Sequence, residues 1–167
     1  MGYHSNSYQS FLDDTKKMPK CKTLSVTLFW EPHGLASVIL HLFRSCNSMR
    51  KFSLTLCHHD PLEYSCPSSC PCCFEDSRRI DNIDLSSLEE VEISSAKISG
   101  EELVFVEVLS RCSATILKKL VINYKAPATP EAKEICKKVR STCRINVEVE
   151  FYVFPDDGPS GRWVRLD

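Results

Sequence analysis

The sequence predicts an α/β protein built as an open solenoid, with parallel strands and with helices on one face of the sheet. The first observation is a strand pattern that returns after nearly the same interval. Leu24 and its alternating neighbours have counterparts that begin at Phe52, and Val91 has counterparts at Leu120 and again at Val149. A period just under thirty residues, with one strand and one helix in each unit, is typical of stacked repeats.

The second observation is that the expected strands alternate between apolar and polar residues. A parallel sheet covered by helices on both faces would instead be apolar along its whole length. The alternation therefore predicts a sheet with one face left without helices, and repeat proteins use such a face for binding. We accordingly expect a binding protein and not an enzyme.

The first two strands are expected at Thr23 to Phe29 and at Met49 to Cys57. Apolar residues at helical spacing between them predict a joining helix: Leu35, Val38, Ile39, Leu42 and Phe43. Residues 21–57 thus form the first repeat-like units, after a polar amino-terminal segment at residues 1–20.

Residues 58–80 interrupt the repeat. The interval from Leu54 to Ile93 is longer than the period, and the excess coincides with a tract rich in Pro, Ser and Cys. Insertions in repeat proteins usually leave the fold as loops on one face. We expect a loop that replaces or distorts one helix.

Residues 81–154 resume the pattern. Strands are expected at Leu88 to Ser94, Leu117 to Tyr124 and Asn146 to Phe154. Ser99 and Glu102 have the spacing of a capping box, which predicts the start of one helix. Thr129 followed by Pro130 predicts the start of the next, because Pro is well tolerated at the first helical position.

The last helix is expected to be amphipathic and to lie on the outside. Its apolar stripe consists of Ala132, Ile135, Cys136, Val139 and Cys143. Its basic residues are Lys133, Lys137, Lys138 and Arg140. These cations could contact phosphate or an acidic partner, but an outer helix needs solvated charges opposite its stripe, so we favour that interpretation. Pro and Gly predict an irregular tail at residues 155–167.

The composition excludes several classes of protein. The 167 residues are 43% hydrophobic and 26% charged, with a net charge of −1, so no general attraction to nucleic acid or anionic membranes is expected. Residues 1–20 hold no secretory apolar run, and no segment reaches the about 18 apolar residues that span a bilayer. We expect an intracellular protein, of the nucleus or cytoplasm, with no membrane partner and no cofactor.

The ten cysteines do not indicate a disulfide framework. Four of them fall within expected helices or at helix ends, where reduced Cys acts as a small hydrophobic residue: Cys46, Cys112, Cys136 and Cys143. Without a secretory signal the reduced state is the better expectation. We therefore predict no structural disulfides.

Three segments of the second half resemble the FBD module that closes many plant F-box proteins. They are Leu88-Glu-Glu-Val-Glu-Ile93, Glu101-Glu-Leu-Val-Phe-Val-Glu107 and Leu117-Lys-Lys-Leu-Val-Ile-Asn-Tyr124. The region from Thr23 to Cys57 resembles the leucine-rich repeats of the same family, and the loop holding Cys66, Cys70 and Cys72 resembles loops of its grass members.

The resemblance implies a leucine-rich-repeat-like solenoid that selects protein substrates for a ubiquitin ligase. Family members dock the Skp adaptor through an amino-terminal F-box. No Leu-Pro-rich, Trp-containing F-box segment precedes Thr23. Skp is therefore expected as a partner only if an F-box exists upstream in a longer form, and otherwise the partner is a protein substrate or another protein.

The candidate binding residues lie on the polar side of the last three strands. If these strands stack in register, three rows form across the sheet: Glu90, Lys119 and Glu148; Glu92, Val121 and Glu150; Ser94, Asn123 and Tyr152. Neighbouring strands are about 4.8 Å apart, so Lys119 is expected between two carboxylates, where it offsets their repulsion. The row that ends in Tyr152 is the more typical of a binding patch.

The alternative function is a zinc-stapled module, for protein or nucleic-acid binding, centred on the Cys-rich loop. Its candidate ligands are Cys57, His58, His59, Cys66, Cys70, Cys72 and Cys73. Four such donors could bind zinc, but the paired Cys-x2-Cys spacing of common zinc modules is absent, so we favour a reduced loop without metal. Catalysis by Cys57 with His58 is also disfavoured, because neighbours along a strand point to opposite faces.

Overall fold

The computed structural model describes residues 11–16, 18–30, 34–58, 83–96, 100–125, 128–154 and 163–166. A short helical turn at residues 11–15 comes first. The elements that follow are β1 (Thr23–Trp30), α2 (Leu35–Ser45), β2 (Lys51–His58), β3 (Glu90–Ser95), α3 (Glu101–Arg111), β4 (Lys119–Tyr124), α4 (Pro130–Thr142), β5 (Glu148–Val153) and β6 (Val164–Arg165).

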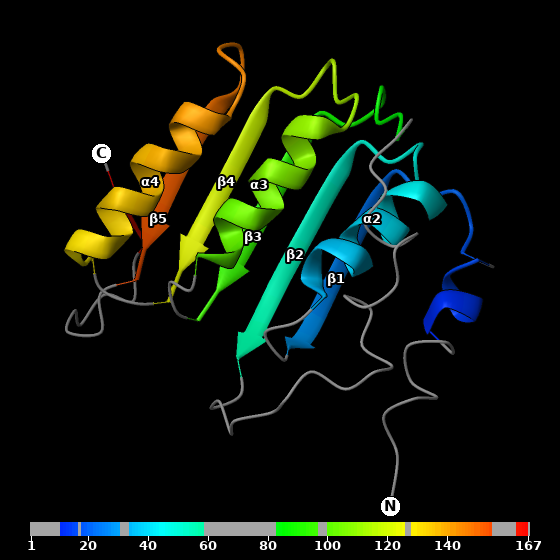
Figure 1. Cartoon of the computed structure of the whole chain (residues 1–167), viewed down its shortest axis with the longest axis horizontal. Helices are drawn as coiled ribbons and strands as arrows, with labels where there is room; N and C mark the ends of the chain where they lie inside the picture. Colours follow the sequence, from blue (N-terminus) through cyan, green and yellow to red (C-terminus); the bar gives the residue numbers. More distant parts are fainter. Residues whose placement is uncertain are drawn as a thin grey trace, which may run out of the picture.

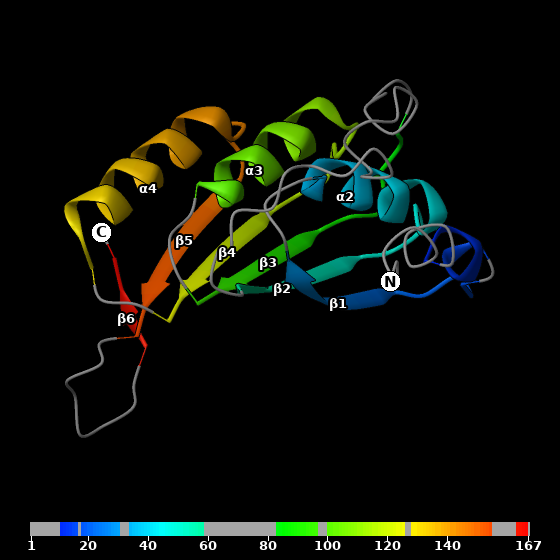
Figure 2. The same ribbon diagram turned by 60° about the horizontal axis from the view of Figure 1, so that its bottom comes forward.

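All six strands form one sheet, and they lie in it in the order of the sequence. β1 to β5 run parallel, and β6 pairs with β5 in the antiparallel sense. The helices α2, α3 and α4 lie side by side along the sheet (Figure 1), and Figure 2 shows all three on the same side of it. The predicted α/β class with parallel strands is confirmed, apart from the antiparallel β6.

The register of the strands follows the sequence period. Leu24 lies opposite Phe52, and Leu54 lies opposite Ile93 across the interrupted repeat. The buried alternate residues of each strand face the helices, so a slip of one residue would move a whole apolar set to the open face. The free-energy cost of exposing these residues explains why the period of the apolar residues predicts which strand residues pair.

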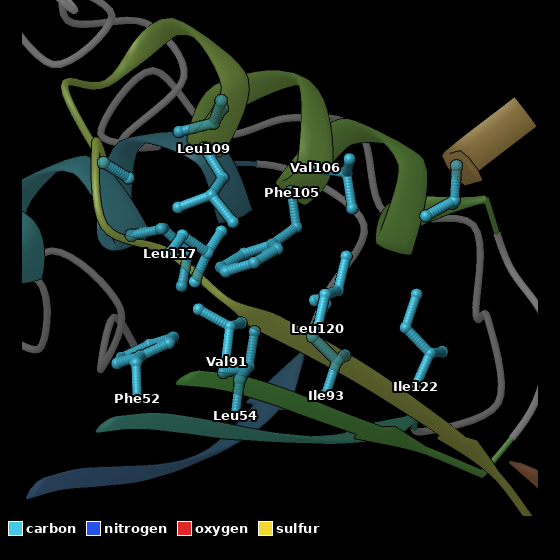
Figure 3. Packing of buried hydrophobic residues seen from close by; sticks show 14 of the residues in the cluster. Phe52, Leu54, Val91, Ile93, Phe105, Val106, Leu109, Leu117, Leu120 and Ile122 are labelled. Carbon is cyan, nitrogen blue, oxygen red and sulfur yellow. The ribbon is translucent and has the colours of Figure 1, made fainter. Parts of the chain in front are cut away.

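The centre of the core is a cluster of three aromatic rings. Phe52 of β2 and Phe105 of α3 are stacked, with ring centroids 6.0 Å apart and an interplanar angle of 4° (Figure 3). Phe43 of α2 meets both rings edge-on, at 5.2 Å from Phe52 and 6.1 Å from Phe105. α2 and α3 contact each other, and the rings of Phe43 and Phe105 lie at this contact. Residues 59–82, which include most of the predicted loop, lie outside the described residues.

The two predicted helix starts have different outcomes. Thr129 caps α4 with its hydroxyl, and Pro130 is the first helical residue, as predicted. The capping box at the start of α3 is wrong, because the N-cap residue is Gly100, with a φ of 83°. That left-handed conformation favours glycine, and a side chain there would be strained. Glu102 is fully buried, and Ser99 lies outside the described residues.

The carboxyl-terminal tail is only partly irregular. Val164–Arg165 form β6, with Arg165 opposite Tyr152 of β5. The prediction of an irregular tail over residues 155–167 is therefore wrong for these two residues. A strand of two residues is too short to show a period in the sequence, and residues 155–162 lie outside the described part of the chain.

The cysteines at the helices are packed as the sequence predicts. Cys46, Cys112 and Cys136 are buried and carry free thiols, and Cys143 is half-buried. Burial raises the pKa of the thiols of Cys112 and Cys136 to about 11, so both remain protonated at neutral pH. A protonated thiol is a poor nucleophile, which leaves packing as the role of these two side chains.

Candidate functional site: the open strand face

The face of the sheet opposite the helices, here called the open face, carries the three predicted rows. The observed register extends each row across β1 and β2. From β1 to β5 the rows are Thr23, Lys51, Glu90, Lys119 and Glu148; Ser25, Ser53, Glu92, Val121 and Glu150; and Thr27, Thr55, Ser94, Asn123 and Tyr152. The predicted alignment is confirmed, and almost every position in it is polar.

The charges on the open face pair both along a row and diagonally. Lys119 lies opposite both Glu90 and Glu148, as expected, and its Nζ is 2.8 Å from Oε2 of Glu150. Glu90 pairs instead with Nζ of Lys51, at 3.7 Å. The expected position of Lys119 between two carboxylates is therefore confirmed, and its ion pair with Glu150 is a contact that the sequence did not indicate. A lysine side chain leans along its strand and reaches the diagonal neighbour of the next strand, which strand alternation alone does not predict.

Glu150 is the most enclosed charge of the open face, with 9% of its side chain exposed. Its carboxylate accepts a hydrogen bond from the Tyr152 hydroxyl at 3.2 Å and lies 3.6 Å from Nη1 of Arg165. The hydrogen bond with Lys119 is the main reason that the pKa of Glu150 is lowered from its ordinary value of 4.5. The same bond raises the pKa of Lys119. The pair is thus held in its charged form.

Replacing Glu150 with glutamine should lower stability near neutral pH and have a smaller effect in acid. Because the folded pKa lies below 4.5, the stabilisation is complete above about pH 4.5 and is lost as the pH falls through the folded pKa. Urea unfolding of the wild type and of Glu150→Gln, compared at several pH values from neutral downward, measures this.

Glu148→Gln is the matched control, because Glu148 is exposed on the same strand and acts on Lys119 only through a weaker attraction than the hydrogen bond of Lys119 with Glu150. A Glu150→Gln effect that stayed constant across the acid range would contradict the assignment of the ion pair.

The polar side chains of the third row also have hydrogen-bond partners within the sheet. The Asn123 side-chain amide donates to Oε1 of Glu92 at 2.9 Å and is 3.3 Å from Oγ of Ser94. Glu92 is in addition 3.7 Å from Nζ of Lys51. These contacts link β2, β3 and β4, so much of the polar surface stabilises the sheet itself.

Aromatic side chains gather where the open face meets β6. The rings of Phe154 and Trp163 meet edge-on with centroids 5.3 Å apart. Strand alternation from the pair Tyr152 and Arg165 places both rings on the open face, and Trp163 is 39% exposed. We call Tyr152, Phe154 and Trp163 the aromatic corner. The alternation of β5 predicted Tyr152, and Phe154 continues it by one further step. Trp163 precedes β6, which has no pattern in the sequence, so no such signal indicated it.

The helix side offers weaker candidates. The four basic residues of α4 are exposed, as predicted, but the Arg140 guanidinium lies 5.4 Å from the centre of the Phe151 ring and donates to the Leu166 carbonyl at 3.2 Å. One of the four cations therefore serves the fold. Between α3 and α4 a small apolar groove is lined by Val106, Leu109, Ser110, Ala114, Leu117, Cys143, Arg144 and Val147. It contains no nucleophile paired with a base.

The zinc alternative gains no support from the described residues. No group of three His, Cys, Asp or Glu side chains in the described ranges could hold a metal ion. Cys57 and the backbone of His58 belong to the end of β2. The other candidate ligands, His59, Cys66, Cys70, Cys72 and Cys73, lie outside the described residues.

The comparisons with known proteins return no relative. No family model matches the chain, and neither a curated protein nor a solved structure is significantly similar to it. In the part of the chain that the structure describes, no helix has both the length and the apolar character needed to cross a bilayer. A function for this chain is therefore inferred from the geometry of the open face.

Proposed function

We propose that this chain is a protein-interaction module that binds a protein partner on its open face, as the substrate-recognition part of a plant F-box protein with leucine-rich repeats and an FBD module does. The support is the repeat of one parallel strand in each period, with the helices gathered on one side. A solenoid of this kind buries one face against its helices and presents the other. The observation that carries the proposal is the aromatic corner beside the polar rows.

The energetics favour the aromatic corner over the charged rows as the source of affinity. Lys51, Lys119 and Glu150 already have partners within the sheet, so a ligand would have to replace existing contacts to use them. Tyr and Trp are enriched among the residues that dominate binding energy, because a large apolar ring loses little conformational entropy on burial. In this proposal the corner gives affinity, and the charged rows set orientation and selectivity.

The partner that fits this chemistry is a protein that presents an apolar side chain or a shallow pocket to Trp163. A basic group on the partner would lie over Glu148, which is exposed at the opposite end of β5. If a longer form of the chain carries an F-box, the module would act as a ubiquitin-ligase receptor. It would then hold the substrate near the ligase and contribute no chemistry of its own.

Replacing Trp163 with alanine should weaken partner binding by about 2 kcal/mol or more, which is roughly thirtyfold. The ring is exposed, so the fold should survive its removal. Affinity purification with quantitative mass spectrometry from the source cells identifies proteins retained by the wild type and lost with Trp163→Ala. The affinity of a recovered partner is then measured directly.

Val164→Ala is the matched control, since Val164 is the next residue in the chain, is 49% exposed and, by strand alternation, points to the other face. Partners retained equally by both variants would refute the role of the corner. The ubiquitin-ligase part of the proposal is tested separately with any longer form, because Skp and cullin subunits should copurify with it.

A further inference from the structure

The two edges of the sheet differ in how they are protected. At one end the sheet closes with β6, a strand of two residues that runs antiparallel to β5. At the other end it stops at β1, a strand of eight residues, and no described residue pairs with its outer edge. Short edge strands discourage pairing with another chain, whereas long ones invite it. Among the described strands, β1 is therefore the unprotected edge.

The backbone groups on that edge can be assigned to particular residues. The Lys22 carbonyl accepts from the Lys51 N–H at 3.0 Å, so the backbone groups of Lys22 point toward β2. Successive residues of a strand point their backbone groups to alternate sides. Those of Thr23, Ser25 and Thr27 therefore point outward. The side chains of these three residues are exposed on the open face.

The apolar residues of β1 are incompletely buried. Leu24, Val26 and Leu28 are only partly buried, whereas their partners in β2 are at most 1% exposed: Phe52, Leu54 and Leu56. The difference arises because β2 has a strand on each side and β1 has one. Residues 23–30 also contain no charged residue and no proline, the two devices with which natural sheets block an edge.

The helix layer continues farther than the sheet at this end. The turn at residues 11–15 packs beside α2, where Phe11 meets the His41 ring edge-on and the Thr15 hydroxyl bonds to the same imidazole. Figure 2 shows the turn near the amino-terminal end of β1, next to α2 and away from β2. The helix layer thus extends past the last described strand, and no described residue fills the place beside β1 in the sheet.

We propose that a second copy of this chain occupies that place, with its β1 antiparallel to the first and a two-fold axis near Val26. In this register Ser25 of each copy exchanges backbone hydrogen bonds with Thr27 of the other, because both residues point outward. Leu24 lies opposite Leu28, and Val26 lies opposite its own counterpart. All the apolar residues stay on the helix side, so their burial is completed.

The charges at the ends of β1 favour the antiparallel arrangement. Lys20 and Lys22 are exposed and lie just before the strand. A parallel pairing of two copies would align Lys22 with Lys22, and like charges directly opposite are destabilising. The antiparallel pairing places the two lysine pairs at opposite ends of the joined strands. It also puts the two open faces on the same side, which forms a bivalent binding surface.

The experiment compares Ser25→Pro with Ser25→Ala by sedimentation and light scattering over a range of concentrations. The wild type is expected at twice the mass of one chain, and Ser25→Ala should match it, because alanine keeps the outward N–H. Proline removes that N–H and blocks edge pairing without touching the β1–β2 hydrogen bonds, so Ser25→Pro should be a folded monomer. Thr27→Pro is the second variant, in case the first fails to fold.

The orientation is tested with Val26→Cys. The two substituted positions would form a non-hydrogen-bonded antiparallel pair about 4.5 Å apart at Cα, which is within the range of a disulfide. Mild oxidation should link the two copies at this position, as mapped by mass spectrometry. The proposal would be overturned by a wild type that is monomeric, including one whose β1 edge binds only a foreign peptide. It would also be overturned by a dimer that persists in both proline variants.

Discussion

Replacing Phe105 with alanine is expected to lower the free energy of unfolding by about 3–5 kcal/mol, the usual cost of removing a buried aromatic ring. Phe105 is 1% exposed and contacts the rings of Phe52 and Phe43. The cavity would open between α2, α3 and β2, where the surrounding side chains can relax only partly to fill it. Chemical denaturation, followed by circular dichroism, measures the loss.

Val104→Ala is the matched control on the same helix. Val104 is 43% exposed, and alanine is the better helix former, so this variant should be as stable as the wild type or slightly more stable. Equal losses for Val104→Ala and Phe105→Ala would show that the ring cluster does not hold α2 and α3 together.

The pairing of the strands could be predicted because two independent signals agree. The alternation in β3 assigns Val91 and Ile93 to one face, and the repeat period selects Leu120 as the partner of Val91. A wrong register would expose the apolar set, so the burial energy enforces what the pattern indicates. The same logic places Glu92, Asn123 and the other polar residues on the open face.

The details of the open face could not be predicted from these signals. The choice of Glu150 as the partner of Lys119 depends on side-chain direction and on Arg165, which arrives from β6. β6 itself is held by pairing with β5 and has no pattern of its own. Trp163 therefore reaches the aromatic corner through tertiary structure that local sequence does not encode.

The start of α3 shows the same limit at a helix end. Ser99 and Glu102 fit a capping box by spacing, yet the N-cap residue is Gly100 and Glu102 is buried. A glycine at this position allows a left-handed turn into the helix. The burial of Glu102 and the glycine cap thus take the place of a local motif worth about 1 kcal/mol.

Replacing Tyr124 with alanine should cost about 3–5 kcal/mol, whereas replacing it with phenylalanine should cost nothing or should stabilise the protein. Tyr124 on β4 is fully buried, and its hydroxyl makes no hydrogen bond with any described residue. A buried polar group without a partner costs about 1–3 kcal/mol, and phenylalanine removes that group while it keeps the ring. Urea denaturation of the two variants separates the ring from the hydroxyl.

Alkaline pH gives a second test of the same hydroxyl. Burial, followed by the neighbouring Glu102, raises the pKa of Tyr124 above its ordinary value of 10.0. The unfolded chain therefore releases this proton first, and stability falls as the pH rises beyond about 10. Tyr124→Phe should lose less stability than the wild type in that range. If Tyr124→Phe were less stable than the wild type at neutral pH, the hydroxyl would have a hydrogen-bond partner. The burial of Tyr124 would then depend on that hydrogen bond as well as on the packing of the ring.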